Sequence, residues 1–289
     1  MKSITHLSAF IIWSTAAVSA SPRAIAAVPS RPDTRYALEC RSSGAPFQAL
    51  LNDVLVSHSD GKEKTPQKAV INFWLKSGKN TLRLLIPKDA VTNPGAAAEC
   101  EIRVNHFSDP ILAGGQKPGR LLTSVTLPAT PALSDKMVTF SLTDKEAPPC
   151  KLWQAAKPFT LDDQAKEGIL KLVGEYRTAL EAQNLDRVVA LEEFRTKDSY
   201  LCTDRPIEEY QVSGKEVTRL LLVPLAGGKF SLWDPSKAEI QQEAGGLVAR
   251  VTVNGQVPIS VTRKGGGPNA QVPINVYVAK VGGKWTLVR

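Results

Sequence analysis

The sequence predicts two domains, an all-β sandwich followed by an α+β domain in which helices pack against a curved antiparallel sheet. Three observations lead to this fold class. Short apolar runs separated by turn residues fill the chain up to Thr143. Prolines then interrupt the pattern, and from Thr160 onward helical periodicity is followed by a series of strands. We expect a sandwich domain at residues 34–144, a linker at 145–159 and the α+β domain at 160–289.

The first 26 residues have the layout of a secretory signal. Lys2 precedes an apolar stretch at residues 9–20, and small residues follow it, with two A-x-A-like cleavage sites that end at Ala20 and Ala26. The stretch is shorter than the roughly 20 residues that a membrane-spanning helix needs. We therefore expect residues 1–26 to be a signal peptide and the mature protein to be periplasmic or secreted, without a membrane span.

The cysteines fit an exported protein. The sequence has 4 cysteines, widely spaced and without a C-x-x-C pair, which is typical of structural disulfides. Of the possible pairings we favour Cys40 with Cys100, which joins two predicted strands. Cys150 would then pair with Cys202 and tie the linker to the end of a helical hairpin. The alternative is a set of buried free thiols.

The strands expected in the first domain have the lengths and spacing of a two-sheet sandwich. They cover residues 36–41, 48–57, 69–75, 81–87, 98–107, 121–127 and 137–142. Residues 70–75 are almost continuously apolar, as in a strand covered on both faces. Residues 76–80 form the next turn, in which Gly78 and Asn80 can take positive φ.

One hairpin in this domain carries a resemblance. The residues from Trp74 to Leu82 follow the pattern W-L-x-x-G-x-N-x-L. This pattern resembles a hairpin of jelly-roll and immunoglobulin-like domains, including the sugar-binding domains attached to glycosidases. The resemblance covers about ten residues, so it supports the sandwich fold and says little about sugar binding.

The second domain begins with helices. Thr160 with Asp163 approximates a capping box, and apolar residues then recur at helical spacing as far as Leu180. A shorter helix is expected at residues 185–194, and a third at 214–223, where Ser213 and Glu216 fit the capping-box pattern. The strands that follow are expected at residues 230–233, 238–242, 247–254, 257–263, 272–280 and 284–288.

The order of these elements resembles the NTF2-like (SnoaL-like) superfamily. Residues 175–186 look like the break between that family's first two helices, and residues 277–288 look like its closing hairpin, with Gly283-Lys284-Trp285 before the last strand. The resemblance implies a cone-shaped domain with a cavity between sheet and helices. It implies no particular activity, because the matching motifs are structural.

Signatures of enzyme chemistry are missing from the sequence. It has no G-x-S-x-G, H-E-x-x-H, Walker A or dinucleotide-binding motif, and the glycine-rich residues 113–120 and 265–268 have the composition of loops. Beyond His6 in the leader, the histidines are His58 and His106. Ser57, Ser59 and Asp60 surround His58, but neighbouring strand residues point in different directions, so a turn is expected rather than a catalytic triad. We therefore expect no catalytic residues, no metal site and no cofactor.

These observations favour a non-catalytic binding or scaffolding protein of the bacterial envelope, whose partner is an envelope protein or a surface polymer. The net charge of +8 comes from scattered Lys and Arg, so no nucleic-acid partner is expected. One alternative is a carrier or sensor of a small apolar ligand, held in the C-terminal cone by aromatic residues: Tyr176, Trp233 and Tyr277. Another is a lyase or isomerase that uses carboxylates and tyrosines from this set: Tyr176, Asp198, Tyr200, Asp204 and Tyr277.

Overall fold

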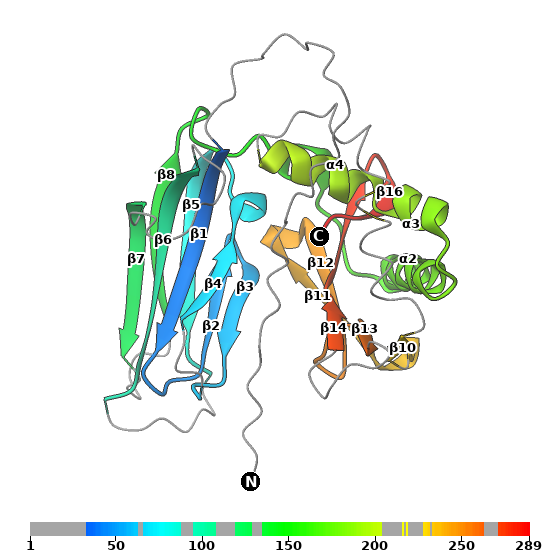
Figure 1. Cartoon of the computed structure of the whole chain (residues 1–289), viewed down its shortest axis with the longest axis horizontal. Coiled ribbons are helices and arrows are strands. Elements are labelled where there is room, and N and C mark those ends of the chain that lie inside the picture. Colours follow the sequence, from blue (N-terminus) through cyan, green and yellow to red (C-terminus); the bar gives the residue numbers. More distant parts are fainter. Residues whose placement is uncertain are drawn as a thin grey trace, which may run out of the picture.

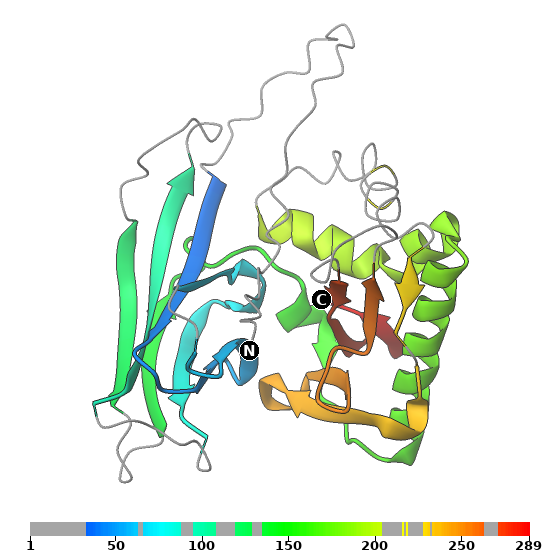
Figure 2. The same cartoon turned by 60° about the horizontal axis from the view of Figure 1, so that its bottom comes forward.

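The computed structural model describes residues 33–62, 66–87, 95–107, 119–128, 135–203, 216, 218, 228–231, 233–262 and 271–289. The chain forms two bodies that lie side by side (Figure 1 and Figure 2). We refer to residues 33–142 as the N-terminal half and to residues 150–289 as the C-terminal half. Antiparallel sheets dominate both, and the helices belong mostly to the C-terminal half.

Two four-stranded antiparallel sheets make up the N-terminal half, as expected for a sandwich. Their orders are β4-β1-β6-β7 and β3-β2-β5-β8. The bounds are β1 Asp33–Ser42, β2 Phe47–Leu51, β3 Val54–Ser59, β4 Gln67–Val70, β5 Gly78–Leu85, β6 Ala97–Phe107, β7 Arg120–Pro128 and β8 Asp135–Leu142. Their inner faces share one hydrophobic core.

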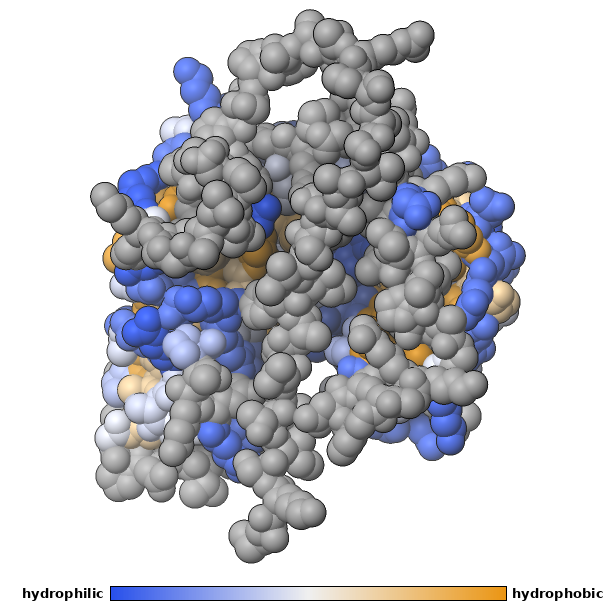
Figure 3. Space-filling model, in the orientation of Figure 1, coloured by the Kyte–Doolittle hydropathy of each residue, from blue (hydrophilic) through white to orange (hydrophobic). Residues whose placement is uncertain are grey.

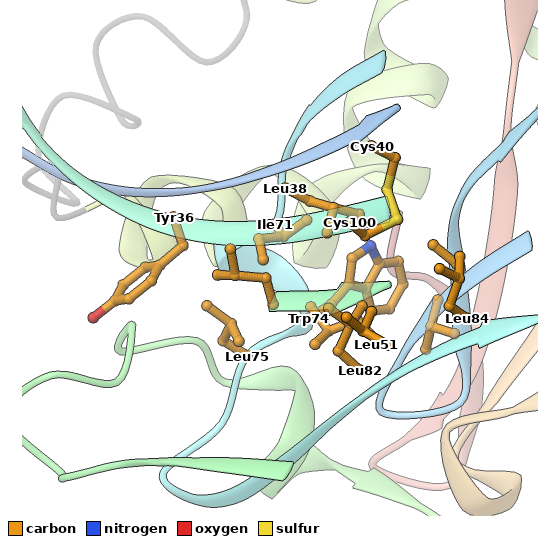
Figure 4. Packing of buried hydrophobic residues seen from close by; sticks show 14 of the residues in the cluster. Tyr36, Leu38, Cys40, Leu51, Ile71, Trp74, Leu75, Leu82, Leu84 and Cys100 are labelled. Carbon is orange, nitrogen blue, oxygen red and sulfur yellow. A yellow bond between two sulfur atoms is a disulfide. The ribbon is translucent and has the colours of Figure 1, made fainter. Parts of the chain in front are cut away.

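Alternation of side chains builds this core. In β1 the buried residues Tyr36, Leu38 and Cys40 take every second position, and β5 buries Leu82 and Leu84 in the same way. Figure 4 shows Trp74 pointing into the same space, with Leu51 and Leu82 beside it and Tyr36 at the opposite end of the cluster.

The Cys40–Cys100 disulfide confirms the expected pairing and joins the adjacent strands β1 and β6. The two cysteines are opposite each other in the strand register, with Cα atoms 4.1 Å apart. The bridge therefore links neighbours within one sheet.

Two strand predictions in this half were wrong. Residues 48–57 do not form one strand, because Asn52 and Asp53 both take positive φ, 52° and 63°, and turn the chain into the hairpin β2–β3. The segment 69–75 leaves its sheet after Val70 and forms the 3-10 turn η1 Asn72–Trp74. Its continuous apolar character arises because both sides of a short turn are buried, which sequence pattern alone does not distinguish from a central strand.

The turn predicted at residues 76–80 lies where it was expected, but only one of the two residues expected to take positive φ does so. Gly78 has a φ of 78°, as expected. Asn80, however, belongs to β5 and stabilises the turn through its buried side chain, which accepts from the backbone N–H of Lys76 and donates to the Lys76 carbonyl.

The C-terminal half begins inside the segment predicted to be a linker. Residues there form α1 Leu152–Ala155 and the short strand β9 Ala156–Lys157, which pairs with β15. Leu152 is fully buried and Ala156 is 5% exposed, and both belong to the core cluster of the N-terminal half. This segment is therefore packed structure that joins the two cores.

The helices that follow are α2 Asp163–Glu181, α3 Leu185–Leu191 and α4 Glu193–Cys202. The N-cap of α2 is Asp162, whose side chain accepts from Ala165 N, so the prediction of Thr160 as the cap was wrong. The single helix expected at residues 185–194 is divided at Glu192 into α3 and the start of α4.

Two antiparallel sheets complete the C-terminal half. Their orders are β11-β12-β15-β16, with β9 beside β15, and β10-β13-β14. The bounds are β10 Lys229–Phe230, β11 Ala238–Glu243, β12 Val248–Val253, β13 Ile259–Thr262, β14 Gln271–Ile274, β15 Val276–Val281 and β16 Lys284–Leu287. The expected strand 272–280 is interrupted at Asn275, and its two parts pair in different sheets.

Several predictions fall on residues outside the described parts of the chain. These are the signal peptide, the glycine-rich loops 113–118 and 265–268, and almost all of the helix expected at 214–223. In the described residues, no helix has both the length and the apolar character needed to cross a membrane.

Candidate functional site

The interior of the C-terminal half is a packed aliphatic core. On α2, Ile169 and Val173 are fully buried, and they belong to one cluster with Val251, Val278 and Leu287 of the sheet. Each of these side chains is at most 1% exposed. Among the described residues, aliphatic side chains therefore pack between α2 and the sheet, the region where the family resemblance predicts a cavity.

Tyr176, predicted to bind a ligand, lies on α2 and is 2% exposed. Its hydroxyl donates to the Glu192 carboxylate, and Arg195 Nη2 lies 3.3 Å from the same hydroxyl oxygen. Burial away from water raises the pKa of Tyr176, and Glu192 adds to this while Arg195 opposes it. Tyr176, Glu192 and Arg195 therefore form a buried, hydrogen-bonded contact between α2 and the start of α4.

The other two predicted ligand residues lie elsewhere. Trp233 packs at the edge of the C-terminal core, beside Gly174 of α2. Tyr277 of β15 turns toward the N-terminal half, where its ring meets Trp74 edge to face with centroids 5.2 Å apart. Tyr176 and Trp233 belong to one core cluster and Tyr277 to the other, so these three residues do not line one pocket.

The residues proposed for a lyase or isomerase are likewise part of the packing. Asp198 is 1% exposed; one of its oxygens accepts from Lys151 N and the other from Arg289. Tyr200 is buried on the same helix, α4. Asp204 is outside the described residues.

His58 lies within strand β3 rather than in the expected turn; it is exposed near the end of the strand, and the buried Ser59 faces the opposite side. His106 pairs with Thr34 on β6, and its side chain is outside the described set. A shallow depression of about 310 Å³ lies between α2 and α3, beside the exposed ion pair of Arg187 and Glu175.

Polar contacts concentrate instead at the boundary between the halves. Asn72, 1% exposed in η1, accepts from Tyr36 N at 2.8 Å and donates to Cys202 O at 3.0 Å. One buried amide therefore ties β1 to the end of α4. The Cys150–Cys202 disulfide, which confirms the expected pairing, fixes the same end of α4 to the segment before α1.

Arg289 crosses the same boundary. Its Nη2 lies 2.8 Å from Asp198 Oδ2 and 3.3 Å from the Phe73 carbonyl oxygen, and its guanidinium stacks on Phe73 and Trp74. Burial lowers the pKa of Arg289, and Asp198 opposes that effect. A cation from the C-terminal half is thus inserted between aromatic rings of the N-terminal half.

A second contact covers the edge of a sheet. Strand β3 is an edge strand with a bulge at Val56, since Ala49 pairs with Ser57 and Leu50 with Leu55. The Leu55 carbonyl accepts from Tyr277 OH at 3.3 Å, and the Leu55 N–H lies on the side of Glu243, where it acts to lower the pKa of that carboxyl group. Side chains of the C-terminal half therefore face this edge of the sheet at Leu55.

Glu243 is the unusual member of this contact. It is 4% exposed; its Oε1 accepts from Arg250 Nε at 2.7 Å, and its Oε2 is buried without a hydrogen-bond partner. Burial is the largest effect on the pKa of Glu243 and raises it, while Arg250 and the Leu55 N–H act in the opposite direction.

Sequence reasoning missed Asn72, Glu243, Arg250 and Arg289. Asn72 did carry a signal, because an amide inside an apolar run has to find partners when it is buried. Glu243 and Arg250 are charged residues in ordinary strands, Arg289 follows β16, and nothing local marks any of the three.

Within the described residues, no group of three or more His, Cys, Asp or Glu side chains is placed to hold a metal ion. Chemically, the boundary consists of hydrogen bonds, buried ion pairs and ring contacts that hold two bodies together. Comparisons of the chain with family models, curated proteins and solved structures give no match.

Proposed function

We propose that this chain is an exported, non-catalytic binding or scaffolding protein of the bacterial envelope. The position of its exposed apolar side chains carries the proposal. Among the described residues, the exposed large hydrophobic side chains are Val70, Leu121 and Met137, at 41%, 47% and 58% exposure. They lie on β4, β7 and β8, and each of these is an edge strand of a sheet in the N-terminal half. Apolar groups beside a sheet edge suit contact with another protein chain.

The buried polar residues support a role without chemistry. Two of the candidate acid–base groups already have partners: Tyr176 bonds to Glu192, and Asp198 bonds to Arg289 and to the Lys151 N–H. The described interior of the C-terminal half is lined by aliphatic side chains. This favours contacts at the surface over a ligand pocket or a lyase site, both of which require a cavity. The proposed membership of the C-terminal half in the NTF2-like superfamily rests on the order of its helices and strands.

A protein partner is favoured over a surface polymer. Every aromatic side chain whose burial the structure describes is at least partly covered, so none offers a flat exposed ring for stacking. On the face seen in Figure 3, hydrophilic residues cover much of the described surface and apolar ones are interspersed among them. Export is supported by the two disulfides, which persist in an oxidising compartment.

The test is capture of a partner from envelope extract by the mature protein and by Leu121→Asp and Met137→Asp variants. An exposed position on the C-terminal half, Glu239→Lys, serves as the matched control. We expect the first two variants to lose a partner that wild type and the control retain. A partner captured equally by all four proteins, or by none, refutes the proposed surface.

A further inference from the structure

The contact around Glu243 differs from the joints that Asn72 and Asp198 make between the halves. Asn72 and Asp198 have partners on both sides of their side chains. Glu243 has a carboxylate oxygen that is buried and unbonded. An ionised carboxylate in that position forgoes hydration without full compensation from hydrogen bonds.

The surroundings of Glu243 place it between three strands. It ends β11, Arg250 faces it from β12, Tyr277 lies on β15, and across the boundary the backbone of Leu55 in β3 faces it. Among the described residues, the charged and titratable groups that interact with Glu243 are Arg250 and Tyr277. Both belong to the C-terminal half, so separating the halves would return the carboxylate to water without breaking this ion pair.

We propose that Glu243 is a pH-responsive joint between the two halves, which docks β3 firmly when the carboxyl group is protonated and loosens when it is ionised. The protonated group is neutral and still offers an oxygen to Arg250. The ionised group is better solvated when β3 moves away. In an exported protein, which meets the pH outside the cell, this joint would regulate how rigidly the N-terminal half is held against the C-terminal half. This regulatory role rests on the proposed function, whereas the pH response of the joint does not.

The direction of the effect follows from linkage. Because the pKa of Glu243 is raised in the docked state above its ordinary value of 4.5, the docked state binds the proton more tightly. Docking is therefore favoured most at and below pH 4.5 and weakens as the pH rises through the raised pKa. Each unit by which docking raises the pKa corresponds to about a tenfold change in the docking equilibrium.

Hydrogen exchange of β3 measures this equilibrium directly, after correction for the intrinsic pH dependence of exchange. In wild type we expect the protection of the Leu55 amide to fall from pH 4.5 to neutral pH, about tenfold for each unit of raised pKa. In Glu243→Gln, which mimics the neutral group, protection stays constant over this range. The control Glu239→Gln, an exposed carboxylate on the same strand, keeps the wild-type profile.

A second variant tests the idea if Glu243→Gln does not fold. Arg250→Gln removes the cation that favours ionised Glu243, so the loss of protection moves to higher pH. The proposal is overturned if wild-type protection does not depend on pH, if Glu243→Gln retains the wild-type profile, or if Arg250→Gln leaves its midpoint unchanged. Each readout is made on purified protein without a partner, so failure here is distinct from failure of the proposed function.

Discussion

Two glycines of α2 provide a matched test of how the C-terminal half is packed. A Cβ added to Gly168 would lie 2.6 Å from Cδ1 of Trp285 and closer still to its Nε1. A Cβ added to Gly174 would meet Trp233 Nε1 at 3.8 Å, which is ordinary contact. Both glycines are interior residues of the same helix.

The expected change in the free energy of unfolding follows from two opposing effects. Replacing a helical glycine by alanine contributes about 1 kcal/mol of stability through helix propensity, and this gain is common to both sites. Gly168→Ala also overpacks Trp285, which is held between Phe159 and Lys280, at a cost of about 1–3 kcal/mol. We expect Gly174→Ala to be more stable than wild type by up to about 1 kcal/mol, and Gly168→Ala to be about 1–3 kcal/mol less stable than Gly174→Ala.

Urea unfolding of both variants, followed by circular dichroism, measures this difference. The comparison is robust because the shared helical gain cancels between the two variants. If Gly168→Ala were as stable as Gly174→Ala, the Trp285 ring would not lie against α2 at Gly168, and this reasoning would be refuted.

The remaining predictions concern the boundary, a turn and a disulfide. Arg289→Ala should lower the free energy of unfolding by about 3–5 kcal/mol, because it leaves the Asp198 carboxylate buried without its cation. Arg187→Ala, in an exposed ion pair, should lower it by less than about 1 kcal/mol. Equal losses of the two variants in thermal unfolding would contradict the buried contact. Asp53→Val should destabilise the protein by about 1–2 kcal/mol relative to Asp53→Gly, because a β-branched residue resists the φ of 63° in the β2–β3 turn. Equal denaturation midpoints of the two variants would argue against a positive φ at this position. Replacing both Cys150 and Cys202 by alanine should lower the free energy of unfolding by about 4 kcal/mol, because the disulfide closes a loop of 52 residues in the unfolded chain. Calorimetry that shows no change would mean that this disulfide does not restrict the unfolded chain.

How much the sequence predicts differs from element to element. The strands β1, β5 and β6 were found because alternation between buried and exposed faces is a local property, and α2 was found from its apolar spacing. The turn η1 was predicted as part of a strand because a continuous apolar run has no hydrophobic periodicity that would distinguish a strand from a buried turn. The division of residues 272–280 at Asn275 was missed because only the pairing partners decide where one sheet ends and the next begins.

By itself, the sequence determined the β-rich first part and the helices that follow it, because each depends on nearby residues, and it favoured the observed cysteine pairing among a small number of alternatives. Only the tertiary structure decided that the predicted linker is packed, that Arg289 enters an aromatic site on the other half, and that Glu243 covers the edge of β3. The boundary contacts join residues up to 222 positions apart. No local pattern encodes such a meeting, since it arises from where whole sheets come to rest against each other.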